Sequence, residues 1–130
     1  MIVLDTHALI WWVSGGPLSK AVREAIDRAS ASRALHASSM TVWEIAVLVK
    51  KGRLELTVEL APWIRSLEAL PALRFVPVDV DIALASTLLP GSLHPDPADR
   101  IIVATARSLD AALVTRDAQL ADYPHVETIW

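Results

Sequence analysis

The amino-acid sequence predicts an α/β fold, a three-layer α/β/α sandwich around a central parallel sheet of four to five strands. Two observations predict this single-domain fold. Short apolar segments alternate along the whole chain with segments of helical periodicity. Such alternation is typical of a parallel sheet covered by helices on both faces. The chain has 130 residues, 53% of them hydrophobic, which suffices for one core. We therefore expect a single domain over residues 1–130.

The predicted strands are short and apolar, as strands buried on both faces of a parallel sheet should be. A cluster of turn or polar residues bounds most of them. They cover residues 2–4, 35–38, 75–78, 111–115 and 126–130.

Helical segments separate the predicted strands. After the turn Gly15-Gly16-Pro17, Ser19 is the type of residue that caps a helix N-terminus, and apolar residues follow it at helical spacing. The other helices are predicted at residues 8–13, 39–51, 59–70, from Asp79 or Asp81 to 89, 99–108 and, as a short turn, 117–120. In the helix over 39–51 we expect one face to carry Met40, Trp43, Ala46, Val47 and Lys50.

Composition limits the chemistry that this chain can perform. It has no cysteine, which excludes disulfides, thiolate metal sites and cysteine nucleophiles. Its formal net charge of −3 argues against a broad basic face for nucleic acid. Seven basic residues could still gather on one surface: Lys20, Arg23, Arg28, Arg33, Lys50, Lys51 and Arg53. The longest apolar runs are too short to cross a membrane and no basic leader precedes the first strand, so we expect a soluble, cytoplasmic protein.

Four acidic residues are predicted to converge at one edge of the sheet. Asp5 follows the first strand, Glu44 lies early in the helix after the second, and Asp117 follows the fourth. The carboxyl ends of parallel strands form the edge at which α/β folds bind ligands. Asp99 reaches this edge differently, because its helix ends beside the start of the fourth strand and must therefore begin at the opposite edge.

Two of these acids lie among apolar neighbours. Glu44 is followed at i+3 and i+4 by Val47 and Leu48, and Asp99 shares its helix face with the apolar residue Ile102. Acids gathered without basic partners repel one another, unless a divalent cation neutralises them. Donor sets made only of oxygen favour hard octahedral ions. The sequence therefore predicts a Mg²⁺ or Mn²⁺ site.

Other interpretations of the same residues remain open. Asp5 can be a helix N-cap, the segment from Thr41 to Glu44 matches a capping box, and Asp96 precedes Pro97 as a cap would. Histidines lie beside two of the acids, since His7 is close to Asp5 and His94 to Asp96. A His/Asp zinc site is thus conceivable, although neither pair has helical i, i+3 or i+4 spacing.

With these residues in view, the chain resembles the PIN-domain family, and within it the VapC-type toxins. The resemblance covers the whole chain, and it is carried by the order and spacing of motifs that are each weak alone. They are Leu4-Asp5-Thr6, Ser38 with Trp43-Glu44-Ile45-Ala46, the run from His94-Pro95-Asp96-Pro97-Ala98-Asp99-Arg100 to Ala106, and Thr115-Arg116-Asp117.

The resemblance implies roles for individual residues. Asp5, Glu44, Asp99 and Asp117 are expected to bind Mg²⁺ or Mn²⁺ and to form the catalytic site, while the hydroxyls of Thr6 and Thr115 orient those acids. Asp96 and Arg100 belong to the same motifs as supporting residues, and Asp96 is expected to act mainly as a cap.

The activity that the resemblance implies is that of an endoribonuclease, the toxin of a toxin–antitoxin pair, in which a metal-activated water attacks an RNA phosphodiester in line. A cognate antitoxin is expected to place its C-terminal tail, often with an arginine, in the acidic groove. A homodimer is also implied, with Trp11, Trp12 and Trp63 as candidates for the apolar surface that a partner covers.

Two alternative functions come from other classes. A Mg²⁺-dependent phosphatase would also gather acids at strand ends, but it would favour a lysine beside them, and no predicted strand ends next to one. A non-catalytic module that binds RNA or protein would require the acids to be structural.

Overall fold

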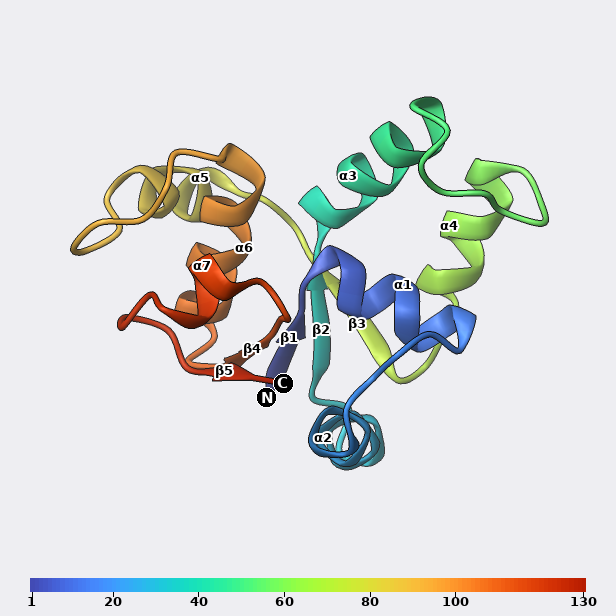
Figure 1. The fold of residues 1–130 in the computed structure, drawn as a ribbon, viewed down its shortest axis with the longest axis horizontal. Coiled ribbons are helices and arrows are strands. Elements are labelled where there is room, and N and C mark those ends of the chain that lie inside the picture. The colour runs from blue at the N-terminus through green and yellow to red at the C-terminus, as the bar shows by residue number, and fades with distance from the viewer.

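The computed structural model describes residues 1–130 and contains five strands and seven helices (Figure 1). The strands are β1 (Ile2–Leu4), β2 (Leu35–Ser38), β3 (Leu73–Val76), β4 (Ala112–Val114) and β5 (Thr128–Ile129). The helices are α1 (Thr6–Ser14), α2 (Lys20–Ala31), α3 (Ser39–Lys50), α4 (Leu60–Glu68), α5 (Val80–Thr87), α6 (Pro97–Ser108) and α7 (Ala118–Ala121). Every predicted strand and helix is present.

Local residue types explain most boundaries. The Ser19 hydroxyl caps α2 by accepting the Val22 N–H at 3.1 Å. Gly15, with φ of 74°, ends α1 in the left-handed conformation that glycine adopts freely. β3 was predicted over residues 75–78 but begins at Leu73 and ends before Pro77, because proline has no N–H for the ladder.

The sheet is parallel throughout, in the order β3-β2-β1-β4-β5. Leu4 of the central strand β1 pairs with Ala37 of β2 on one side and with Val114 of β4 on the other. The predicted α/β architecture with a parallel sheet is therefore confirmed. It also brings the residues that follow β1, β2 and β4 to one edge.

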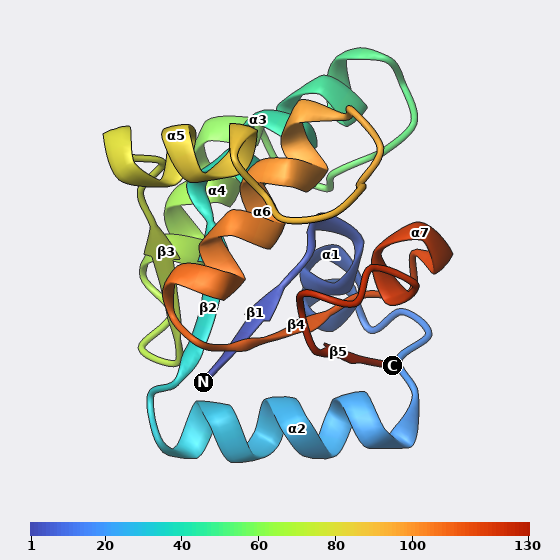
Figure 2. The ribbon, with the colours of Figure 1, turned by 90° about the vertical axis from the view of Figure 1, so that its left-hand side faces the viewer.

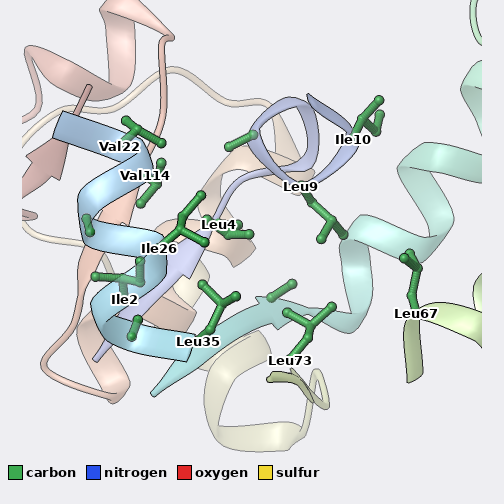
Figure 3. Close-up of a cluster of buried hydrophobic side chains, with 14 of the residues drawn as sticks. Ile2, Leu4, Leu9, Ile10, Val22, Ile26, Leu35, Leu67, Leu73 and Val114 are labelled. Carbon is green, nitrogen blue, oxygen red and sulfur yellow. The ribbon is translucent and has the colours of Figure 1, made fainter. Parts of the chain in front are cut away.

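Helices cover both faces of the sheet, and the two layers differ in size. Figure 1 shows α5, α6 and α7 on one side of the strands and α1, α3 and α4 on the other, and in Figure 2 α2 runs along the bottom of the molecule. The larger core cluster has 16 buried residues, and Figure 3 shows Leu4 and Leu35 of the sheet packed against Ile26 of α2. The smaller cluster, of 8 buried residues, lies between the opposite face of the sheet and α6.

Alternation along the strands separates these clusters. In β1, Ile2 and Leu4 belong to the larger cluster and Val3 to the smaller, because successive side chains of a strand point to opposite faces.

No helix of the structure has both the length and the apolar character that a membrane span requires.

The helix face that periodicity predicts for α3 is not the face that the structure buries. Trp43, expected on a shared face with Met40 and Val47, is 59% exposed, whereas Thr41 and Ile45 are the fully buried residues of this helix. α3 carries apolar residues almost all the way round, so periodicity alone does not select the face that meets the sheet.

Candidate functional site

A cleft of about 560 Å³ opens at the carboxyl edge of the sheet. In Figure 2, β1 runs from the N-terminus towards this edge and continues directly into α1. The cleft is lined by Asp5, Thr6, His7, Trp11, Glu44, Asp96, Asp99, Ile102, Arg116 and Asp117. The structure thus brings all four predicted acids to one place, together with Thr6 and Asp96.

Asp5 stands at the junction of β1 and α1. Its N–H donates to the Val114 carbonyl at 3.0 Å, which continues the pairing of β1 with β4. Its Oδ1 accepts the Ala8 N–H at 2.8 Å, so the residue is an N-cap. Burial raises the pKa of the Asp5 carboxyl above its usual range, and hydrogen bonds from Thr115 and Ala8 offset part of that rise.

Glu44 is held by a threonine of the neighbouring helix. The Thr6 hydroxyl donates to Glu44 Oε1 at 2.5 Å and lies 3.1 Å from the hydroxyl of the buried Thr41. Burial raises the pKa of Glu44, while the bond from Thr6 lowers it. The capping-box interpretation of Thr41 to Glu44 is wrong, because Ser38 is the N-cap of α3 and Glu44 lies further along the helix.

Asp99 is paired with a histidine from the preceding loop. His94 Nε2 lies 2.8 Å from Asp99 Oδ2, and the two side chains are only 19% and 21% exposed. The other ring nitrogen, Nδ1, is buried without a hydrogen-bond partner. A proton there would be unsatisfied, so the tautomer that fits is the one in which Nε2–H donates to Asp99. Burial raises the pKa of Asp99, His94 lowers it, and nearby Asp96 raises it further.

Asp96 and Asp117 cap helices at the rim of the cleft. Asp96 Oδ1 accepts the Ala98 N–H at 2.9 Å and so starts α6 ahead of Pro97. Asp117 Oδ1 accepts the Gln119 N–H at 2.8 Å, and the Asp117 N–H donates to the Thr115 hydroxyl at 3.1 Å. Both carboxylates are exposed, so a ligand in the cleft can reach the oxygens not used for capping.

Arg100 does not reach the cleft. Its guanidinium donates to the carbonyls of Ser86 and Leu93, both at 2.9 Å, and this ties the loop that carries His94 to the end of α5. Sequence reasoning did not assign several residues to the site, among them His7, Trp11 and Arg116 of the cleft lining and His94 beside Asp99. Arg116 lines the cleft without an ionic partner, and His94 meets Asp99 rather than its sequence neighbour Asp96. Arg116 lies within Thr115-Arg116-Asp117, and His94 begins the run from His94 to Ala106. Their positions in these motifs were the signal that could have identified them.

No lysine or arginine pairs with the acids of the cleft. The ion pairs of the structure are Lys20–Glu24, Arg65–Glu68 and His94–Asp99. The basic residues of α2 and of the end of α3 belong to elements that lie at opposite ends of the view in Figure 1. A cleft of partly buried carboxylates without basic partners is chemically suited to a divalent cation.

His94, Asp96 and Asp99 form a group of possible ligands, with one donor atom of each within 4.8 Å of the others. Asp5, Glu44 and Asp117 lie around the same space. A zinc site would need an imidazole nitrogen, but His94 Nε2 is engaged with Asp99 and Nδ1 is buried. His94 is therefore not free to bind zinc, and His7 is the one imidazole that lines the cleft. The other charged donors of the cleft are carboxylate oxygens, which favours Mg²⁺ or Mn²⁺.

Comparison with known proteins defines the family. The PIN domain model matches residues 2–126, and the chain belongs to the PIN-domain family. It is similar to Ribonuclease VapC22 of Mycobacterium tuberculosis, with 33% identity over 133 residues that cover 99% of this chain and 98% of that protein.

Two solved structures illustrate the shared fold. VapBC2 from Rickettsia felis, bound to a DNA fragment from its promoter, has a TM-score of 0.72 at 15% identity and covers 99% of this chain and 98% of its own. FitAcB from Neisseria gonorrhoeae has a TM-score of 0.71 at 23% identity and covers 100% of this chain and 97% of its own.

Proposed function

We propose that this protein is a Mg²⁺- or Mn²⁺-dependent endoribonuclease and the toxin of a toxin–antitoxin pair, acting in the cytoplasm. The observation that carries the proposal is the convergence of Asp5, Glu44, Asp99 and Asp117 on one cleft without a lysine or arginine partner. Membership of the PIN-domain family and the similarity to a named ribonuclease support it.

The donor set fits a hard divalent ion. Asp5, Glu44, Asp99 and Asp117 would hold it, with Asp96 as a further rim carboxylate. When bound, the ion supplies water activation and charge stabilisation for hydrolysis of an RNA phosphodiester. Without the ion, the negative phosphate of the RNA would meet several carboxylates. Burial and mutual repulsion already disfavour the charged form of these carboxylates.

The chain's own residues keep the carboxylates in place. The Ala8 N–H fixes one oxygen of Asp5, the Thr6 hydroxyl fixes Glu44, and His94 fixes Asp99. Glu44 and Asp99 each retain an oxygen that these bonds do not use, and Asp5 is bonded by Thr115 as well as by Ala8. Such preorganisation limits the rearrangement needed when ion and substrate arrive.

The antitoxin is the second part of the proposal. Structures similar in fold to this chain are toxin–antitoxin complexes, including one from Klebsiella pneumoniae. An acidic cleft suits inhibition by an arginine from a partner's tail, because a guanidinium can bind a carboxylate through two hydrogen bonds.

The homodimer stays a prediction. Trp11, Trp12 and Trp63 are partly buried against the larger core. Val80 and Leu84 of α5, and Leu88 at its C-cap, expose apolar side chains.

The test is cleavage of single-stranded RNA by the purified protein with Mg²⁺, with Mn²⁺ and with EDTA. We expect cleavage only with a metal ion, and its loss in Asp99→Asn. Asp27→Asn is the matched control, because Asp27 is an exposed residue of α2 outside the cleft. Cleavage by Asp99→Asn at the wild-type rate would contradict the site assignment.

The alternative functions predict different outcomes. A phosphatase would release phosphate from small phosphomonoesters, but no lysine lines the cleft and its basic residue is Arg116. A non-catalytic module would bind RNA and leave it intact with either metal ion.

A further inference from the structure

Part of the cleft lining is aromatic and basic rather than acidic. It consists of His7 and Trp11 of α1 and of Arg116, which follows β4. None of these residues is used to hold the carboxylates. We call His7, Trp11 and Arg116 the aromatic wall.

The sheet register explains why these residues line the same cleft. Leu4 pairs with Val114, so the chain segments that leave β1 and β4 lie side by side at the carboxyl edge. α1 begins directly after β1, and its residues 7 and 11 are i and i+4 on one helix face. The rings of His7 and Trp11 have centroids 5.7 Å apart and are inclined at 52°.

The Trp11 ring is held from behind. Its centroid lies 5.6 Å from that of Trp130, with the rings inclined at 64°. A Cβ at Gly16 would lie 2.7 Å from Trp11 Cδ1, so only glycine fits there, and the Gly16 N–H donates to the Trp11 carbonyl at 2.8 Å. The ring is therefore supported by packing on one side while it lines the cleft.

Core packing alone does not account for Trp11. The residue packs against the larger core cluster, but it is only partly buried and forms part of the cleft surface. Its neighbour Trp12 packs against the same cluster and does not line the cleft. His7 is exposed, and so is Arg116, which has no ionic partner.

We propose that the aromatic wall is a subsite for one unpaired base of the RNA, placed next to the phosphate that the acidic side of the cleft receives. The inference rests on the proposed nuclease function and adds the place in the cleft at which one base of the RNA is held. Aromatic rings bind unpaired bases through their faces, largely without regard to sequence. Arg116 supplies the positive charge for the adjoining backbone phosphate that the carboxylates lack.

Binding of RNA can be measured without cleavage. In an Asp99→Asn background the RNA should stay intact, and fluorescence anisotropy then gives the affinity for a short labelled single strand. We expect Trp11→Ala to weaken binding roughly five- to a hundredfold, the range found when a stacking aromatic residue is replaced by alanine. Trp11→Phe should recover part of the loss. Trp12→Ala, on the same helix and packed on the same core, is the matched control and should bind like the parent.

A double-mutant cycle distinguishes stacking from general loss of structure. A series of strands, each with an abasic site at a different position, should identify one position at which removal of the base weakens binding by the parent protein. The same abasic site should have no further effect on Trp11→Ala, because the two changes remove one interaction. If Trp11→Ala does not fold, three other variants replace it in the cycle. They are Trp11→Phe and, at the two exposed residues of the aromatic wall, His7→Ala and Arg116→Gln.

The outcomes separate the subsite from the nuclease function. Three results would overturn the subsite. The first is that the abasic site and Trp11→Ala weaken RNA binding independently, so that their effects add. The others are an equal loss of affinity in Trp12→Ala and no RNA binding at all. A coupled cycle in a protein whose wild type never cleaves RNA with Mg²⁺ or Mn²⁺ would support the subsite and contradict the proposed nuclease.

Discussion

Asp5 and Asp79 make the same local interaction in two different regions of the molecule. Each caps the helix that follows a strand, and each accepts the N–H three residues ahead through Oδ1 at 2.8 Å. Asp5 follows the central strand β1 and lines the cleft. Asp79 follows the edge strand β3, is exposed and does not line the cleft.

The difference shows that the capping role and the site role are independent. A helix cap uses one oxygen of the carboxylate. The surroundings of the second oxygen depend on where the preceding strand lies in the sheet. At Asp5 the surroundings are Thr115, Glu44 and Asp99, and burial there raises the pKa of the Asp5 carboxyl. Asp79 is therefore a natural internal control for Asp5.

The largest effect is expected for the pair Asp5→Asn and Asp79→Asn. Asparagine caps helices about as well as aspartate, so both variants should fold. Asp5→Asn should lower metal-dependent RNA cleavage by about a hundredfold or more, since changes even to groups that only support a metal ligand cost about 10- to 100-fold. Asp79→Asn should cleave at the wild-type rate. Equal activity of the two variants would break the distinction between the two caps.

A smaller effect is expected at His94. His94→Ala removes the partner of Asp99 but none of the four proposed carboxylate ligands, and it should lower cleavage by roughly 10- to 100-fold. The control is His125→Ala, because His125 is exposed and lies outside the acidic cleft. Initial rates at saturating Mn²⁺ measure both. A wild-type rate for His94→Ala would show that Asp99 does not need this support.

The smallest effect concerns stability without metal. Because the folded-state pKa of Asp5 is raised, the folded protein holds its proton to higher pH than the unfolded chain, and ionisation destabilises the fold. Asp5→Asn should therefore raise the Tm of the metal-free protein by a few degrees at neutral pH. This gain should shrink as pH falls through the raised pKa and vanish below the unfolded value of about 3.8.

Asp79→Asn provides the reference for that measurement. Its Tm in EDTA, followed by circular dichroism over the same pH series, should stay close to that of the wild type. A destabilised Asp5→Asn protein at neutral pH would mean that the Asp5 charge is already compensated within the chain.

Much of the fold and the convergence of the acids could be predicted from the sequence. Alternating apolar strands and helices determine a parallel sheet, and the sheet brings Asp5, Glu44 and Asp117 to its carboxyl edge. Asp99 could be placed because a helix that ends at the start of β4 must begin at the other edge. These steps depend on topology, which short-range sequence patterns encode well.

The remaining features depend on side-chain contacts that periodicity does not encode. The exposed face of α3 at Trp43 was missed because that helix is apolar on nearly all sides. The contact of His94 with Asp99 depends on the path of a proline-rich loop, and Arg100, expected near the site, instead donates to two backbone carbonyls. Such contacts follow from loop conformation rather than from residue spacing.

Thermal unfolding with and without Mn²⁺ tests the central claim most directly. An ion that binds only the folded protein must stabilise it, by about 2.7 kcal/mol when its concentration is a hundred times its dissociation constant. We predict a Tm increase of several degrees for the wild type and for Asp79→Asn, and little or none for Asp5→Asn. A wild-type Tm that does not change at millimolar Mn²⁺, or an equal increase in Asp5→Asn, would contradict a divalent-cation site at this cleft.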